Sequence, residues 1–185
     1  MKRVFALLFV VIIGVACAFA YDFPRWKTMP LHVYVPQNAG IYSRLMYKAF
    51  DAWQQKSGGL VRFKYVTRPS EADIYVEFVD YVTNCGNESA VGCCHSATRN
   101  GFFTQNYIEI GTKETSMVVN RNGKFVKQET GRTNDHMYGV MLHEIGHALG
   151  LEHSADNNSI MYPIDLNELQ YLTNTDLQLL RNKYR

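Results

Sequence analysis

The stretch HEIGHALGLEH, residues 143–153, holds three of the six histidines of the chain. His143 and His147 are four residues apart, so on a helix their imidazoles project from one face and can bind the same ion. His153 would lie too far round if the helix continued. Gly150 can take a left-handed conformation, end the helix and bring His153 back toward the ion. The stretch therefore predicts a helix that ends at Gly150 and three histidines on one metal ion.

The glutamate in this stretch is the candidate catalytic residue. Glu144 follows the first histidine and points about 100° away from it around the helix, so its carboxylate lies beside the ion and not on it. Three protein ligands leave the fourth position of a tetrahedral zinc ion for water. A carboxylate beside that water is placed to act as a general base in hydrolysis. The opposing interpretation, a polar helix with solvated histidines, explains neither Gly150 nor His153.

The rest of the chain predicts one domain of strands and helices. Strands are predicted at residues 31–35, 61–66, 74–79 and 107–110, with a short edge strand at 90–96. Helices are predicted from 38 or 39 to 56, from 134 or 135 to 149, and from 173 or 174 to 184. A strand, helix, strand order implies parallel pairing through a crossover. Phe50 and Trp53 share the apolar stripe of the first helix, which predicts that both lie in the core. Residues 117–128 predict a hairpin, because Asn122-Gly123 supplies a tight turn.

The first twenty residues have the pattern of a signal peptide. Lys2 and Arg3 precede an apolar run, and a small-x-small site ends at Ala20, so we expect a mature chain that begins at Tyr21. The alternatives are an uncleaved membrane anchor and a lipid-modified Cys17. We expect a secreted protein, extracellular or periplasmic, with no membrane contact after cleavage.

The charge balance argues against nucleic acid as a partner. Cleavage of the leader leaves 17 basic and 17 acidic residues, and no basic patch is visible in the sequence.

Three cysteines stay in the mature chain. Export favours a disulfide from Cys85 to Cys93 or to Cys94, and the spacing does not decide between them. The thiol left over is either a partly buried free cysteine, an intermolecular bridge, or a group that binds or blocks a metal.

The site motif and its surroundings resemble the metzincins, and within them the matrixins. Residues 143–153 fit the metzincin signature HExxHxxGxxH, and Ser159-Ile160-Met161-Tyr162-Pro163 resembles the Met-turn of that class. Ser154 after the third histidine, the short connection to Met161 and the tail at 172–184 favour the matrixin branch. The resemblance implies an α+β metzincin (zincin-like) fold, with a twisted mixed β-sheet and two long helices. It also implies an upper subdomain of about 21–150 and a small lower subdomain of about 151–185 that ends in a helix.

The resemblance implies a zinc endopeptidase that acts on protein or peptide substrates. We expect it to be secreted, because of its leader, and to be a monomer. His143, His147 and His153 would bind one catalytic zinc, with Glu144 as the general base. Met161 would form an apolar floor beneath the ion, and Pro163 would form part of a pocket wall. The alternative is a module on the same fold that binds peptides or host proteins without turnover, but pure binding would not require a base at Glu144.

Several features depart from the matrixin pattern. Only ten residues separate Ala20 from Leu31, so we expect no long propeptide with a cysteine on the zinc. Only His95 lies in the middle of the chain, where a second, structural zinc would need more histidines, so we expect one zinc. The glycine-rich calcium loop is missing, which leaves calcium undecided. Asp165 stands where many matrixins have tyrosine, so cleavage specificity is not carried over. The family also implies an ion pair between a new amino terminus at Tyr21 and Asp176.

Overall fold

The computed structural model describes residues 24–83, 85–86, 90–163 and 171–184. The predicted signal peptide, Cys17, Tyr21 and Asp165 lie outside these ranges. In the described part of the chain, none of the helices has both the length and the apolar character needed to cross a membrane.

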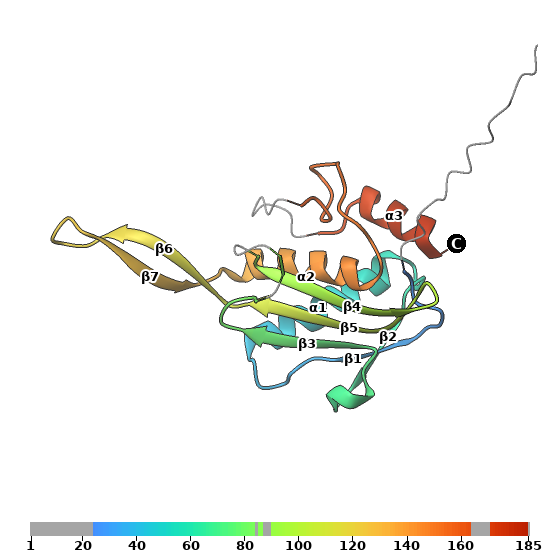
Figure 1. The fold of residues 1–185 in the computed structure, drawn as a ribbon. Coiled ribbons are helices and arrows are strands. Elements are labelled where there is room, and N and C mark those ends of the chain that lie inside the picture. The colour runs from blue at the N-terminus through green and yellow to red at the C-terminus, as the bar shows by residue number, and fades with distance from the viewer. Residues whose placement is uncertain (1–23, 84, 87–89, 164–170, 185) are drawn as a thin grey trace, which may run out of the picture.

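The main sheet has five strands in the order β2-β1-β3-β5-β4 (Figure 1). Its strands are β1 (Leu31–Tyr34), β2 (Phe63–Val66), β3 (Ile74–Val79), β4 (Gly92–Arg99) and β5 (Phe102–Gly111). β1 pairs in parallel with β2 and β3, β3 pairs in parallel with β5, and β4 is antiparallel to β5. The sheet is therefore mixed, as predicted, and the strand expected at residues 90–96 is the longer edge strand β4.

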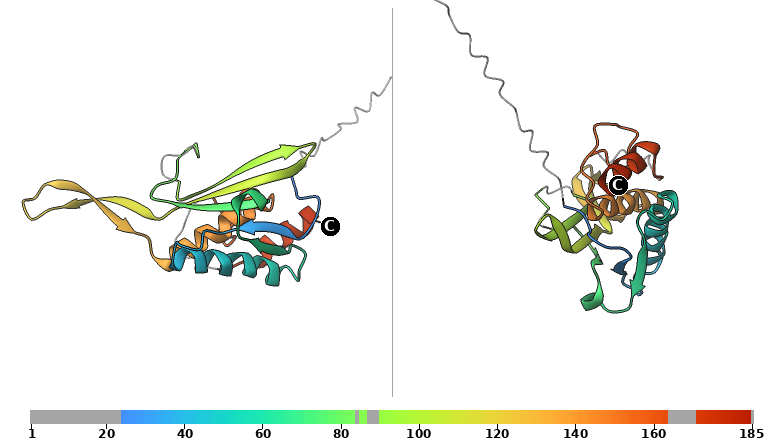
Figure 2. Two further views of the ribbon diagram at one scale, coloured as in Figure 1. Left: turned by 90° about the horizontal axis from the view of Figure 1, so that it is seen from below. Right: turned by 90° about the vertical axis from the view of Figure 1, so that its right-hand side faces the viewer.

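Two long helices, α1 (Ile41–Lys56) and α2 (Asn134–Ala148), lie on one face of this sheet (Figures 1 and 2). Phe50 and Trp53 of α1 are fully buried, as the apolar stripe predicted. The indole Nε1 of Trp53 donates a hydrogen bond of 3.0 Å to the carbonyl of Leu142 in α2. The third helix, α3 (Asn174–Tyr184), lies on the far side of α2 from the sheet. A short 3₁₀ helix, η1 (Pro69–Glu71), joins β2 to β3.

The strands β6 (Lys113–Val119) and β7 (Phe125–Gly131) form a separate two-stranded sheet that projects from the body (Figures 1 and 2). The predicted hairpin is present and is longer at both ends than residues 117–128. The tight turn expected at Asn122-Gly123 is also present: Gly123 has a positive φ of 72°, and its N–H donates to the carbonyl of Asn120 at 3.0 Å. The amide carbonyl of the Asn120 side chain accepts from the backbone N–H groups of Asn122 and Lys124, which stabilises this turn.

The structure joins Cys85 to Cys93 by a disulfide, one of the two pairings that spacing left open. Cys94 carries a free thiol and packs partly buried against the hydrophobic core. The disulfide ties the segment that follows β3 to the start of β4. The position of that edge strand matters for the site, because β4 passes directly over α2.

Candidate active site

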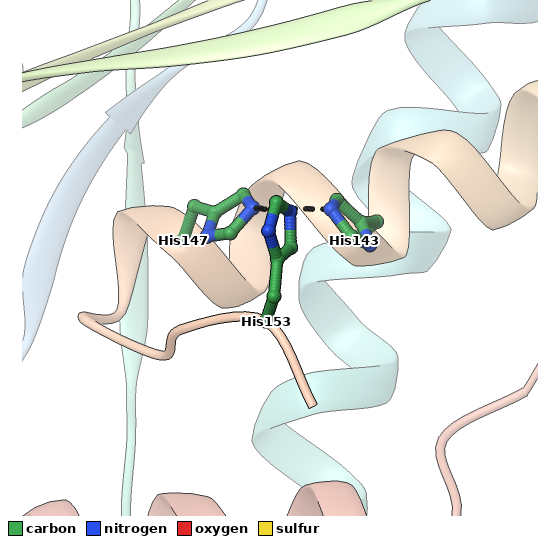
Figure 3. A group of neighbouring side chains, drawn as sticks. All are labelled: His143, His147 and His153. Atoms are coloured by element: carbon green, nitrogen blue, oxygen red, sulfur yellow. Dashed lines mark hydrogen bonds between the residues drawn. The ribbon is translucent and has the colours of Figure 1, made fainter. Parts of the chain in front are cut away.

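The last turn of α2 determines where the third histidine lies. Gly150 has φ of 88°, a left-handed conformation, and its N–H donates to the carbonyl of His147 at 2.8 Å. A Cβ atom at this position would lie 2.4 Å from the carbonyl oxygen of Pro24. Both the backbone conformation and the space around it therefore require glycine. The chain turns back here, and His153 comes to lie over the same face of the helix as His143 and His147 (Figure 3).

Side chains from distant parts of the chain satisfy the carbonyl groups at this helix end. The carbonyl of Ala148 accepts from Trp26 Nε1 at 2.7 Å and from Asn106 Nδ2 at 2.8 Å. The carbonyl of Leu149 accepts from the hydroxyl of Tyr184 at 2.9 Å. The final carbonyl groups of a helix have no partner inside the helix, so these bonds fix the end of α2 and the turn that begins there.

The three imidazoles bring their Nε2 atoms together (Figure 3). Nε2 of His147 lies 3.0 Å from Nε2 of His143 and 3.2 Å from Nε2 of His153. All three nitrogens lie within 4.8 Å of one another, as the ligands of one metal ion would. Zinc–nitrogen bonds of about 2.0–2.1 Å in a tetrahedron place their ligand atoms about 3.3–3.4 Å apart. A small inward or outward shift of the rings is enough to fit this ion.

The outer nitrogens of two of these rings show which tautomer is present. Nδ1 of His143 lies 2.6 Å from the carbonyl oxygen of Ile160, and Nδ1 of His147 lies 2.9 Å from that of Leu151. A carbonyl oxygen only accepts, so each Nδ1 carries the hydrogen and each Nε2 presents a lone pair. Burial, followed by the neighbouring His143, lowers the pKa of His147 to about 4. Lone pairs this close repel one another unless a cation lies between them, so the donor set fits a metal ion.

Glu144 is almost fully buried beside this group, with 6% of its surface exposed. Burial raises the pKa of its carboxyl to about 8. Strand β4 covers it closely, since a Cβ atom on Gly92 would lie 2.6 Å from Glu144 Cγ and 2.7 Å from Oε1. The absence of a side chain on Gly92 is what leaves room for the carboxylate. The sequence analysis missed this residue, although a glycine inside a strand often marks such a close approach.

The free thiol also belongs to the surroundings of Glu144. Cys94 lies two residues along β4 from Gly92, so both face the same side of the sheet. Burial, and after it the Glu144 carboxylate, raises the pKa of the Cys94 thiol well above its usual range. The thiol is therefore protonated at neutral pH, and it is not among the described side chains that converge on the three histidines.

Met161 packs beneath the histidine helix. Its side chain is fully buried, and a Cβ atom on Gly146 would lie 2.2 Å from the Met161 sulfur. Gly146 directly precedes His147, so the methionine supports the turn of α2 that carries the histidines. Pro163 is exposed, and residues 164–170, which follow it, lie outside the described ranges. The expectation that Pro163 forms part of a pocket wall therefore stays a prediction.

The carboxylate of Asp176 in α3 holds the segment that precedes Met161. It is fully buried, and it accepts from Ser159 Oγ at 2.5 Å, from the Ile160 N–H at 3.2 Å and from the Thr173 N–H at 2.7 Å. The carbonyl of the same Ile160 is the partner of His143 Nδ1. α3 therefore orients one of the three clustered histidines through two hydrogen bonds, a role that the sequence analysis missed. The predicted partner of Asp176, Tyr21, lies outside the described residues.

The fold and the site together define a class of protein. A mixed sheet is backed by a helix that carries two histidines and a glutamate, and a glycine at the end of this helix turns the chain so that a third histidine joins them. This combination is that of the metzincin class of metal-dependent peptidases. The chain belongs to the matrixin family of zinc-dependent peptidases, whose family model matches residues 28–185. It is 27% identical over 166 residues to the interstitial collagenase of Oryctolagus cuniculus, a match that covers 86% of this chain and 31% of the collagenase. It is 62% identical over 32 residues to "Probable matrix metalloproteinase 095L" of Invertebrate iridescent virus 3, which covers 17% of this chain and 9% of that protein. The chain thus spans less than a third of the length of either relative.

Proposed function

We propose that this chain is a secreted zinc endopeptidase in which His143, His147 and His153 hold one zinc ion and Glu144 is the general base. The observation that carries the proposal is the convergence of three histidine Nε2 atoms beside a buried glutamate. Membership of a zinc-dependent peptidase family supports it independently.

Glu144 would transfer protons in this reaction. A zinc ion bound by the three histidines supplies a Lewis acid that lowers the pKa of its water to about 7. The Glu144 carboxylate takes a proton from the water that attacks the scissile carbonyl and passes it to the departing amine. Gly92 confines that carboxylate from one side, so the base has few positions open to it.

The edge strand supports an extended peptide as substrate. β4 lies at the end of the strand order, so its outer edge has no neighbouring strand within the described part of the chain. A peptide can pair with such an edge as an additional strand. Because Gly92 of β4 lies against Glu144, a peptide bound there would pass close to the base and the three histidines.

The proposal includes the domain arrangement expected from the sequence. Residues 1–20 would be removed during export, with an upper subdomain at about 21–150 and a lower one at about 151–185. The Cys85–Cys93 disulfide supports export, because such bonds persist mainly in oxidising compartments.

The test uses the chain from Tyr21 onward, loaded with zinc. We expect elemental analysis to return one tightly bound zinc, and we expect cleavage of a diverse peptide mixture that a chelator abolishes. Two or more tightly held zinc ions would contradict the single site. A zinc-loaded chain that binds peptides but cuts none of a broad library would favour the binding module instead.

A further inference from the structure

The tip of the β6–β7 hairpin, residues 116–128, combines exposed apolar side chains with exposed cations. Met117 and Val119 are each 58% exposed, Phe125 is 71% exposed and Val126 is 38% exposed. Exposed apolar groups this close together mark interaction sites more often than chance surface residues do. A two-stranded hairpin alone is also marginally stable in water, so an uncovered tip of this kind calls for a partner.

The strand register distributes these apolar residues over both faces of the hairpin. Val119 pairs with Phe125 and Met117 pairs with Lys127, which places all four on one face. Val118 pairs with Val126, which places a second apolar pair on the opposite face. A protein partner that packs against one face would leave the other uncovered. A medium that surrounds the tip would cover both.

The charges at the tip are all positive. From residue 116 to residue 128 the sequence contains Arg121, Lys124 and Lys127 and no acidic residue. These three side chains are exposed, and within the described ranges none forms an ion pair. The cations at the root of the hairpin, the end joined to the body, do have acidic partners: Lys113 pairs with Asp80 and Arg132 pairs with Glu114. Acidic partners thus neutralise the root while the tip keeps its full positive charge.

We propose that the tip of the β6–β7 hairpin, residues 116–128, is a docking surface for an anionic lipid membrane. Val119 and Met117 lie about 7 Å apart along the strand, at about 3.4 Å per residue. That span matches the depth of about 5–10 Å to which apolar residues enter the interface of a bilayer. Lys127 would contact anionic headgroups while Phe125 and the valines enter the layer below. Arg121 and Lys124 lie in the turn beyond Phe125, and their long side chains would reach back to the same headgroups. The proposal is independent of the proposed catalysis.

This surface differs from the sequence-based expectation of no membrane contact after removal of the leader. The sequence presents Met117, Val119 and Phe125 as ordinary strand residues, which pack into a core in most sheets. In the structure these side chains are uncovered because the hairpin projects from the body. Its hydrogen bonds to the body lie near the end joined to the body, at Thr112, Lys113 and Thr115.

Vesicle flotation tests the proposal on the zinc-loaded chain from Tyr21 onward. We expect it to bind vesicles of phosphatidylcholine with about 25% phosphatidylserine and to bind pure phosphatidylcholine vesicles much more weakly. Replacing Arg121, Lys124 and Lys127 with glutamine should weaken binding to the anionic vesicles at least about tenfold. Val119→Ser combined with Phe125→Ser should weaken it by a similar factor, because the apolar part of the contact is lost.

The matched control removes the same charge from the body. Lys56→Gln, Arg62→Gln and Lys64→Gln alter three exposed cations away from the hairpin, and we expect binding to anionic vesicles within about twofold of the parent. Zinc content and thermal unfolding should be unchanged in every variant. Equal losses in the body and tip variants would overturn the proposal, because the attraction would then be general. So would a parent that binds no vesicle at low salt, or one that forms dimers through the tip instead.

Discussion

The end of α2 and the tip of the β6–β7 hairpin are built in opposite ways. Around the three histidines, backbone and side chains from β4, β5, α3 and the segment before β1 all contact α2 or the loop after it. At the hairpin tip, β6 and β7 pair only with each other in the sheet arrangement. Catalytic groups need positions fixed to within a fraction of an ångström, and only the first region supplies the contacts for that. Substitutions should therefore have large effects in the first region and small ones in the second.

Glu144→Gln should have the largest effect. The change keeps the size of the side chain but removes the proposed general base, so the rate of peptide hydrolysis should fall by about 10² to 10⁴. Zinc content and thermal unfolding should stay close to those of the parent, because the three histidines are untouched. A variant that cuts peptides as fast as the parent would remove Glu144 from the proposed mechanism.

Gly92→Ala should displace Glu144, the proposed base, without removing it. The new Cβ would lie 2.6 Å from Glu144 Cγ, so the carboxylate must move, and a misplacement of about 1 Å can reduce a rate by about 10². The matched control is Gly131→Ala on β7, where an added Cβ meets nothing within 4 Å. We expect kcat to fall in the first variant and not in the second, with zinc retained in both. Equal activities would mean that Gly92 does not position Glu144.

The metal-free protein should lose stability as the pH rises from 6.5 to 8. Burial raises the pKa of Glu144 in the folded state to about 8, from 4.5 for an exposed glutamate. The folded state therefore binds the proton more tightly, and the stability this confers is lost as the pH rises through that window, by about 2 kcal/mol. Chemical denaturation of the parent and of Glu144→Gln at both pH values measures it. The glutamine variant should lack this loss, and an equal loss in both proteins would assign it to other groups.

Asp176→Asn should destabilise the lower part of the site by a smaller amount. The amide keeps one acceptor but brings an NH₂ group toward donors from Ile160 and Thr173, so the free energy of unfolding should fall by about 1–3 kcal/mol. Zinc should also dissociate faster, because Ile160 orients His143. Asp156→Asn, a less buried carboxylate in the same region, is the control. Unchanged unfolding and zinc release would show that these hydrogen bonds do not matter.

Substitutions at the hairpin tip should have the smallest effect on the fold. Val119→Ser and Phe125→Ser each remove an apolar side chain that is already mostly in water, so each should change the free energy of unfolding by less than about 0.5 kcal/mol. Denaturant titration of the two variants measures this change. A loss of several kcal/mol would mean that the tip packs against the body and that the contrast between the two regions is wrong.

The sequence predicts local relations between residues far better than contacts between distant residues, for a physical reason. His143, His147 and Gly150 are neighbours on a single helix and its end, so helical geometry alone relates them. The core positions of Phe50 and Trp53 follow from local periodicity in the same way, whereas the mixed sheet was implied by the resemblance to the matrixins. Gly92 and Asp176 act on the site across long stretches of chain, and no local pattern shows which residue a glycine or an aspartate will meet. The tight turn at Asn122-Gly123, in contrast, was predicted because a local pair of residues supplies the positive φ that Gly123 adopts.

The capping of α2 has a consequence for the timing of synthesis. Trp26 and Tyr184, which are 158 positions apart, both donate to the last carbonyl groups of this helix. Closing so long a loop is entropically costly and comes late, and Tyr184 leaves the ribosome long after the three histidines do. A nascent chain therefore contains the whole HEIGHALGLEH stretch while the turn that holds His153 still lacks its partner from α3. The proposed active site therefore reaches its final form only after Tyr184 has been made and its hydroxyl has bonded to the carbonyl of Leu149.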